Sequence, residues 1–175
     1  MKKLTHITVL LLFLLPPVFC RAESEKVEES FQDLNSKSAI TFSPGNKEAT
    51  TDLLTYTCTG TKAEFGSDGT RIVIKLVNNG EYVTTTRVDE LKRIFIYCNN
   101  SVTPSNYKIY LSKDSVDFGT PLSAGIEYLS AGTIDATFPR GNYYVRIVNT
   151  ASSNSLFIKR IDYYMDHCNC FEYVP

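Results

Sequence analysis

The chain contains no tryptophan and only two histidines, and these scarcities narrow the chemistry available to it. Beyond residue 22 the one histidine is His167, in the run Asp166-His167-Cys168-Asn169-Cys170. A histidine and two thiols could supply three ligands to zinc, but a closed structural site needs a fourth and usually draws on spaced pairs. A Cys–His catalytic pair normally takes its two partners from separate elements of the fold. We therefore expect no metal ion, no cofactor and no catalytic residue in this run.

Carboxylates and glycines are not arranged for catalysis either. Acids such as Asp68, Asp114 and Asp117 fall singly in turns, where Asp is favoured because its side chain bonds to nearby backbone. A glycoside hydrolase needs two carboxyl groups that face each other across the sugar, and no two acids stand out as such a pair. Gly66-Ser67-Asp68-Gly69 is not followed by a helical pattern, so a phosphate-binding loop is not supported. The sequence predicts a protein that is not an enzyme.

Long apolar runs are absent except at the N-terminus. Lys2 and Lys3 precede the unbroken apolar segment Val9–Leu15, and Cys20 and Ala22 place small residues at the positions that a signal peptidase requires. We interpret residues 1–22 as a signal peptide and expect export to the periplasm, the cell surface or the medium. No later stretch approaches the about 20 apolar residues of a membrane span, so we expect no transmembrane segment.

A lipid anchor at Cys20 is the alternative to cleavage after Ala22. Lipid-attachment signals favour a small residue directly before the cysteine, whereas Phe19 is large. Cleavage after Ala22 is therefore the interpretation that the sequence favours.

Excess positive charge is also lacking. The chain has 18 Lys and Arg against 19 Asp and Glu, for a net charge of −1. Removal of residues 1–22 deletes Lys2, Lys3 and Arg21 but no acid, so the remaining chain is distinctly acidic. Nucleic acids and anionic membrane surfaces need clustered Lys and Arg. We therefore expect no nucleic-acid partner.

Four cysteines remain after the signal peptide: Cys58, Cys98, Cys168 and Cys170. An exported chain can form disulfides, and four cysteines allow three pairings that the sequence cannot separate. A bridge between Cys168 and Cys170 would be strained, because only one residue separates them. We favour the alternative in which Cys58 and Cys98 are free, small apolar residues of the core.

Short β-prone runs separated by turn residues make up most of the chain, and no amphipathic helix is convincing. The expected domains are a mobile acidic leader at 23–30, a β-domain at 31–165 and a Cys-containing tail at 166–175. The expected strands are Ala39–Ser43, Leu53–Cys58, Ala63–Phe65, Arg71–Val77, Glu81–Thr86, Leu91–Cys98, Asn106–Ser112, Ile126–Ser130, Thr133–Phe138, Asn142–Asn149 and Asn154–Tyr164. About ten such strands predict an all-β, antiparallel β-sandwich.

Four local features of this pattern can be compared with a structure. Arg71–Val77 and Glu81–Thr86 flank Asn78-Asn79-Gly80 and predict a hairpin. Asn142–Asn149 and Asn154–Tyr164 predict a second, longer hairpin, separated by small polar residues. Leu91–Cys98 is apolar on both faces, which is typical of a central strand covered on both sides. The apolar phase slips at Lys159-Arg160, where we expect a β-bulge.

Several of these segments resemble a known family. Glu81–Thr85, Val88–Tyr97, Lys108–Asp114 and the two last strands are together similar to the jelly-roll, galactose-binding-like accessory domains of exported Bacteroidetes proteins. The likeness covers about Phe31 to Met165. Such domains often accompany polysaccharide lyases, other glycan-active enzymes and secreted nucleases. The resemblance implies a jelly-roll fold and a non-catalytic, carbohydrate-binding role.

One departure from that family concerns calcium. Many of its members end in a strand of the form Ile-Asp-Asp-Ile, whose acids help to hold a structural calcium ion. Here the matching stretch is Ile158-Lys159-Arg160-Ile161, with two cations in place of two carboxylates. Calcium requires several oxygen ligands, usually with carboxylates among them, so we expect no such site in this chain.

A ligand site is expected either on the concave face of a sheet or among the loops at one end of the sandwich. The candidate loops are Asn99–Asn106, Asp114–Thr120 and Pro139–Asn142. The candidate ligand-binding residues are amides, one guanidinium and one outward-facing aromatic ring: Asn99, Asn100, Asn106, Arg140 and Tyr110. Two partners fit the pattern: a glycan, or an envelope protein that docks on a sheet face or on the tail.

Overall fold

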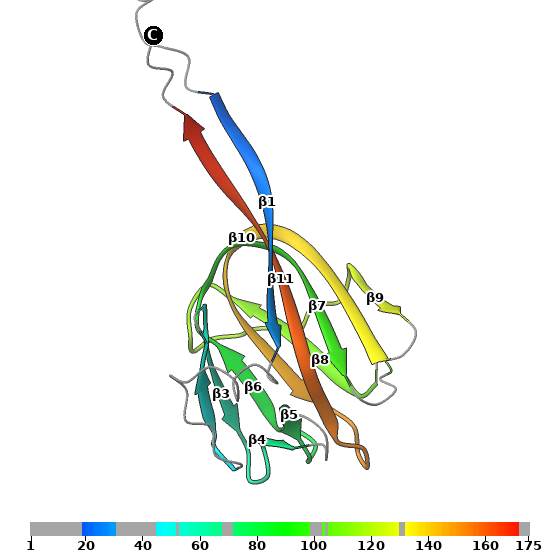
Figure 1. Ribbon diagram of the computed structural model, residues 1–175. Helices are drawn as coiled ribbons and strands as arrows, with labels where there is room; N and C mark the ends of the chain where they lie inside the picture. Colours follow the sequence, from blue (N-terminus) through cyan, green and yellow to red (C-terminus); the bar gives the residue numbers. More distant parts are fainter. Residues whose placement is uncertain are drawn as a thin grey trace, which may run out of the picture.

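The computed structural model describes residues 19–30, 45–51, 53–67, 72–98, 103, 105–129 and 132–171, and it describes the side chains of this set except those of 19–23, 29–30 and 167–171. The described chain is built from antiparallel strands (Figure 1). No helix long and apolar enough to cross a membrane occurs in this part of the chain.

Two sheets pack face to face. Sheet A contains, in spatial order, β4 (Glu64–Ser67), β5 (Ile72–Leu76), β11 (Leu156–Phe171), β7 (Val88–Cys98), the first half of β10 (Thr133–Asn149) and β9 (Ile126–Leu129). Sheet B contains β2 (Glu48–Thr50), β3 (Thr55–Thr59), β6 (Tyr82–Thr85), the second half of β10 and β8 (Tyr107–Ser112). The prediction of an all-β, antiparallel sandwich of jelly-roll type is confirmed.

β10 belongs to both sheets and joins them. Thr133–Thr137 pairs with β7 and β9, whereas Tyr144–Asn149 pairs with β8 and β6. Between these halves the register with β7 shifts on either side of Gly141, and there the strand arches from one layer to the other (Figure 1). Bulges bend a strand and increase its twist, which lets one strand serve two sheets.

The core lies between the sheets and is filled by alternate residues of each strand. Ile94, Ile96 and Ile161 of sheet A and Ile147 of sheet B are fully buried. The buried Tyr56 hydroxyl of sheet B donates to the Tyr163 hydroxyl of sheet A over 3.1 Å, so a hydrogen bond also links the layers. Cys58 and Cys98 are free thiols in this core, as predicted, and burial raises the pKa of each to about 12.

Neither predicted hairpin forms. β5 and β6 flank the turn at Asn78–Gly80 but lie in different sheets, and the second half of β10 lies in sheet B whereas β11 lies in sheet A. Buried polar side chains replace the missing hairpin bonds. Glu81 accepts backbone N–H bonds at the first connection, and Asn149 Nδ2 donates to Leu76 O at 2.8 Å and to Asn154 O at 3.1 Å at the second.

The central position of Leu91–Cys98 and the predicted bulge are both found. β7 lies between β10 and β11 in sheet A, with Phe95 and Tyr97 half-buried on its outer face. The register of β11 against β7 shifts between Ile158 and Arg160, at the predicted bulge.

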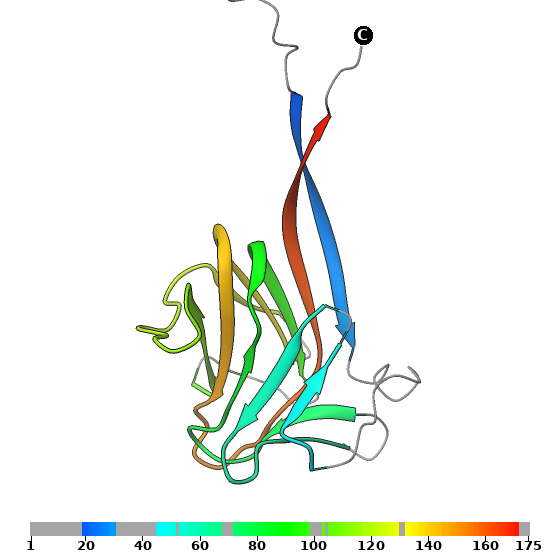
Figure 2. The ribbon, with the colours of Figure 1, turned by 90° about the vertical axis from the view of Figure 1, so that its left-hand side faces the viewer.

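Residues 23–30 are not a mobile leader in the structure. They form the second part of β1 (Phe19–Ser30), which pairs with β11 in the register Lys26↔Tyr164 and Glu28↔Asp162. Lys26 Nζ lies 3.0 Å from the buried carboxylate of Asp162, a non-local ion pair that composition alone does not reveal. β11 likewise continues to residue 171 instead of ending before the expected tail, and it extends with β1 beyond the sandwich (Figures 1 and 2).

Candidate binding sites on sheet B and at the β10 bend

A groove crosses the outer face of sheet B, and we call it the threonine groove. Its volume is about 280 Å³. The lining residues are mostly hydroxyl-bearing and come from β3, β6, β10 and one loop: Thr55, Thr57, Thr59, Tyr82, Thr84, Thr85, Thr86, Ser115, Tyr144 and Arg146. The groove is slightly smaller than a typical small-molecule pocket, which favours a ligand that lies across the strands with one side exposed.

Arg146 lines the threonine groove and is held on both sides by aromatic rings. Its guanidinium carbon is 4.4 Å from the centre of the Tyr82 ring and 3.7 Å from that of Phe118. Its Nε donates to Thr84 Oγ1 at 3.3 Å. The two Nη groups have no acceptor among the described residues, so a pre-oriented pair of donors faces the groove.

The threonine hydroxyls of the groove differ in availability. Thr85 Oγ1 accepts the Val145 N–H at 3.1 Å, and Thr86 Oγ1 accepts the Thr55 N–H at 3.0 Å. The exposed Thr57 and Thr59 have no hydrogen-bond partner for their hydroxyls in the described part of the chain. These two side chains can therefore donate to and accept from a ligand.

The loop after β8 is rigid and closes one side of the groove. Asp114 Oδ1 accepts the backbone N–H groups of Val116 at 2.9 Å and Asp117 at 2.7 Å, and these bonds lower the pKa of Asp114. Ser112 Oγ donates to the carbonyl of Asp117. The loop thereby holds Phe118 against Arg146.

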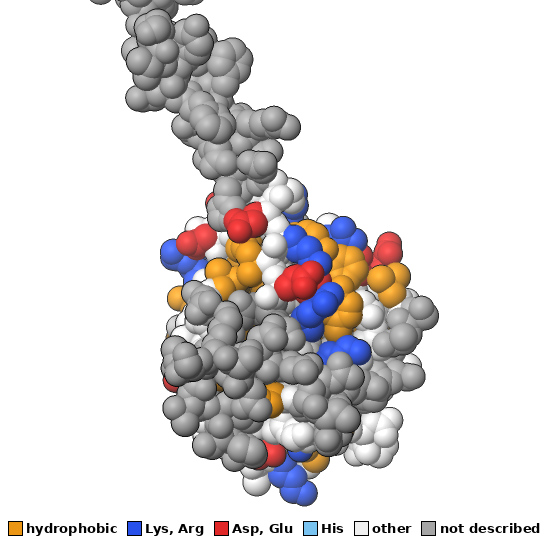
Figure 3. Space-filling model, in the orientation of Figure 1, with side chains coloured by type: hydrophobic (Ala, Val, Ile, Leu, Met, Phe, Trp, Pro, Cys, Tyr) orange, Lys and Arg blue, Asp and Glu red, His pale blue; other side chains and the backbone are white. Residues whose placement is uncertain are grey.

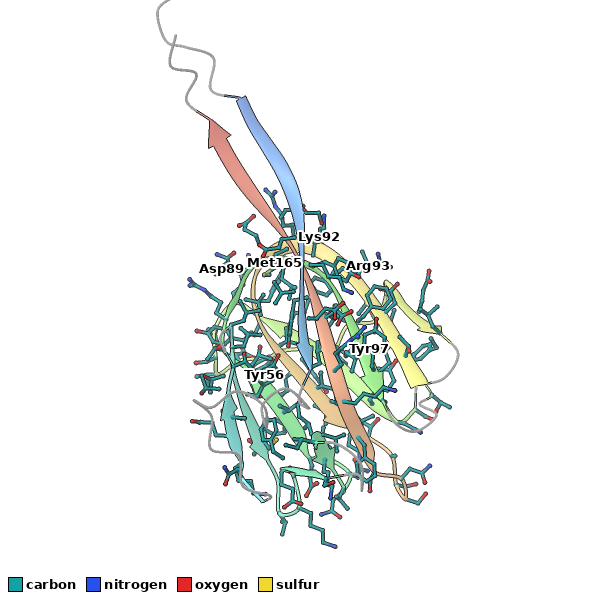
Figure 4. All side chains as sticks on the ribbon, in the orientation of Figure 1. Tyr56, Asp89, Lys92, Arg93, Tyr97 and Met165 are labelled. Carbon is teal, nitrogen blue, oxygen red and sulfur yellow. The ribbon has the colours of Figure 1, made fainter. Side chains whose placement is uncertain are left out.

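A second pocket, which we call the end pocket, lies where β10 bends. Its volume is about 420 Å³. Its lining is mostly charged or polar: Arg87, Glu90, Lys113, Arg140, Gly141, Asn142 and Tyr143. Figure 4 places Asp89 and Lys92 at this end of the sandwich. The two sites share no lining residue.

The structure separates the residues that the sequence singled out. Tyr110 lies opposite Arg146 on β8, on the same outer face of sheet B as the threonine groove. Arg140 lines the end pocket. Asn106 directly precedes β8, and its backbone carbonyl accepts the Thr150 N–H at 2.9 Å. Asn99 and Asn100 lie outside the described residues.

Pro139–Asn142 is not a loop but part of the bend of β10, and it approaches the loop that follows β8. Lys113, next to the Asp114–Thr120 loop, and Arg140–Asn142 both line the end pocket. Sequence reasoning missed Arg146, Thr57 and Thr59. The sequence feature that could have indicated Thr57 and Thr59 is the alternation of outward threonines with buried residues in Thr55–Thr59, which was interpreted only as a strand.

The outer face of sheet A has a different character. Arg93 lies 4.4 Å from the Phe95 ring centre and donates from Nε and Nη2 to Asp135 at 2.9 and 2.6 Å. Arg160 lies 4.1 Å from the Tyr97 ring centre. Figure 3 shows basic, acidic and hydrophobic side chains intermixed on this face, and Figure 4 shows Arg93 and Tyr97 along it. These rings are covered by the protein's own cations.

The stretch in which the sequence predicts the absence of a calcium site is Ile158–Ile161. Arg160 Nε lies 2.9 Å from Asp162 Oδ1, so a guanidinium already neutralises the nearest carboxylate. No group of three potential metal-ligating side chains occurs within the described side chains.

Comparisons with known proteins find distant structural similarity. No family model and no curated protein matches the sequence. The K2 cleaved adhesin domain of Lys-gingipain aligns with 81% of this chain and 100% of its own, at 16% identity and a TM-score of 0.49. A family two carbohydrate esterase from Cellvibrio japonicus aligns with 87% of this chain and 37% of its own, at 12% identity and a TM-score of 0.42. These similarities assign no activity to this chain.

Proposed function

We propose that this chain is an exported, non-catalytic module that binds a glycan in the threonine groove. The observation that supports it most strongly is Arg146, whose guanidinium is fixed between two rings with its Nη donors directed to the groove. Sugar hydroxyls both donate and accept, and the unpaired hydroxyls of Thr57 and Thr59 match that chemistry. Export is inferred from the sequence of residues 1–22, which has the pattern of a signal peptide.

Tyr110 extends this surface toward β8. It is half-buried, and its register with Arg146 places both side chains on one face of sheet B. Because the protein has no tryptophan, tyrosine rings are its largest surfaces for stacking on a sugar ring. We expect Tyr110→Ala to weaken binding and to leave the melting temperature nearly unchanged; if it unfolds the domain instead, Tyr110 has a structural role.

Retention of the protein on a panel of neutral plant and host polysaccharides tests the function. Thr57→Val keeps the shape of the side chain but removes its hydroxyl, and should weaken binding roughly two- to ten-fold. Arg146→Gln should weaken it further. Lys108→Gln is the matched control, because Lys108 is exposed on the same face but outside the groove. Absence of retention on every polysaccharide would overturn the proposal.

A protein partner on sheet A is the second candidate. Its outer face combines Phe95, Tyr97 and Tyr164 with Arg93 and Arg160, residue types that are enriched in protein interfaces. A partner that docks there should co-purify from the native envelope with the wild type and not with Phe95→Ala.

The control for that experiment is Val116→Ala, an exposed apolar residue in the loop after β8, on the sheet B side of the sandwich. Equal co-purification with the wild type and both variants would exclude this face as the docking surface.

A further inference from the structure

The end pocket has a local excess of positive charge on an otherwise acidic protein. Three cations line it, Arg87, Lys113 and Arg140, with Glu90 as the one lining acid. The neighbouring Asp89 pairs with Arg87 at 2.8 Å. The pocket region therefore remains positive after both acids are counted, whereas the whole chain has a net charge of −1.

The two arginines leave donors free at this pocket. Arg87 contacts Asp89 through Nε, and Arg140 contacts Glu90 through Nε at 3.1 Å. Their Nη groups have no acceptor among the described residues, and Lys113 has no acidic partner there. A planar guanidinium bonds an oxyanion through such a free edge, and an ammonium acts as a point charge beside it.

The backbone around the end pocket is held in an unusual conformation. Glu90 is the one non-glycine residue with positive φ, 55°, among the described residues. The backbone N–H of Glu90 donates to Asn142 Oδ1 at 2.9 Å, and this bond fixes the orientation of the Asn142 side-chain amide. Strained residues and bulges cluster at binding sites, because there the strain positions particular side chains.

An aromatic ring, Tyr143, is among the residues that line the end pocket. Tyr143 donates its hydroxyl to the Pro139 carbonyl at 3.0 Å and meets Phe138 edge-on at 5.7 Å. A Cβ on Gly141 would lie 2.9 Å from the Tyr143 ring, so a larger residue there would displace the ring from this position. The pocket thus combines a rigid ring with free cationic donors.

We propose that the end pocket binds the oxyanion group of an acidic polysaccharide, either the carboxylate of a hexuronic acid or a sulfate ester. Lys113 and the free edges of Arg87 and Arg140 bond the anion, and the Tyr143 ring contacts the sugar to which it is attached. The site is separate from the threonine groove and does not depend on a ligand being bound there.

The test compares retention of the full secreted protein on polygalacturonate, on a sulfated galactan and on a neutral galactan. Lys113→Gln should weaken binding to the acidic polymer roughly ten-fold. Arg87→Gln should have a similar effect and serves as a second variant. Lys108→Gln removes the same charge from an exposed site outside both pockets and should leave binding unchanged. Melting temperatures verify that every variant is folded.

The pattern across polymers decides the outcome. Retention on polygalacturonate alone identifies a carboxylate, retention on the sulfated galactan alone identifies a sulfate ester, and retention on both identifies a general oxyanion site. No retention on either acidic polymer overturns the proposal, as does an equal loss in Lys108→Gln, since that indicates non-specific charge attraction. Arg146→Gln distinguishes the two sites, because it should affect the neutral polymer and leave Lys113-dependent binding intact.

Discussion

Glu81→Gln should destabilise the fold strongly, although it changes only one atom of the side chain. Glu81 is 4% exposed, and its side chain accepts four hydrogen bonds. The donors are Lys62 N at 2.7 Å and Asn78 Nδ2 at 2.9 Å on Oε1, and Val77 N at 2.7 Å and Asn78 N at 2.9 Å on Oε2. These bonds replace a hairpin ladder at the crossing between β5 and β6.

The magnitude follows from the geometry. Each carboxylate oxygen of Glu81 accepts two hydrogen bonds. The amide of a glutamine keeps the two bonds to its oxygen, but its NH2 group would face the two donors that bonded to the other oxygen. Hydrogen bonds to charged groups contribute about 1.5–3 kcal/mol each. We expect a loss of about 3 kcal/mol or more in the free energy of unfolding, which lowers the melting temperature by roughly 6–12 °C for a domain of this size.

The effect should also depend on pH. Burial raises the pKa of Glu81, but the bonds from Asn78, Lys62 and Val77 outweigh burial, and the net pKa in the folded state is lowered. A lowered folded-state pKa gives stability that is complete above the unfolded value of about 4.3 and is lost as the pH falls through the folded value. The difference in the free energy of unfolding between the wild type and Glu81→Gln should therefore become smaller below about pH 4.3.

Urea unfolding followed by tyrosine fluorescence and far-ultraviolet circular dichroism provides the assay, since the chain has eleven tyrosines and no tryptophan. Glu48→Gln is the control, because Glu48 is exposed on β2 and should change stability by less than about 0.5 kcal/mol. A Glu81 variant as stable as the control, with an unchanged pH profile, would refute the role assigned to this carboxylate.

Three further predictions concern the core and its connections. Gly60→Ala should cost about 1–3 kcal/mol, because Gly60 has a φ of 138° and a Cβ there would lie 2.4 Å from Glu81 Cγ; an unchanged melting temperature contradicts this. Tyr56→Phe removes the bond between the two sheets and should lower stability by about 0.5–1.5 kcal/mol in urea unfolding. Cys58 and Cys98 should resist alkylation at pH 8 until urea unfolds the protein, because burial raises the pKa of both to about 12; peptide mass spectrometry measures this, and rapid labelling of the native protein would count against it.

The sequence by itself determined where most of the described strands lie and which of their faces is buried, although β1 and β2 were not predicted. Side chains alternate across a strand, so the pattern of β8 identifies Tyr107 and Ile109 as inward and Tyr110 as outward. The same periodicity locates the bulge at Lys159-Arg160, because a slip in parity must be compensated by an extra residue. Burial of Cys58 and Cys98 follows from the same alternation.

Only the tertiary structure decided which strands pair and which polar residues meet. The alternation of apolar and polar residues indicates which face of a strand is buried, but it does not indicate which strand lies next to it in the sheet. β10 and β11 are adjacent in sequence, yet the buried bonds of Asn149 place the connection between them across two sheets. Residues 23–30 pair with β11, and Lys26 there lies beside Asp162, which is far away in the sequence.

The candidate sites illustrate the same division. Arg140 was singled out by residue type and loop position, but its approach to Lys113 depends on the bend of β10. Arg146 was read as one residue of a strand, and only packing places it between Tyr82 and Phe118. Local alternation is determined by backbone geometry over a few residues, whereas a binding site needs side chains from distant segments, whose meeting is decided by how the two sheets bury their apolar faces against each other.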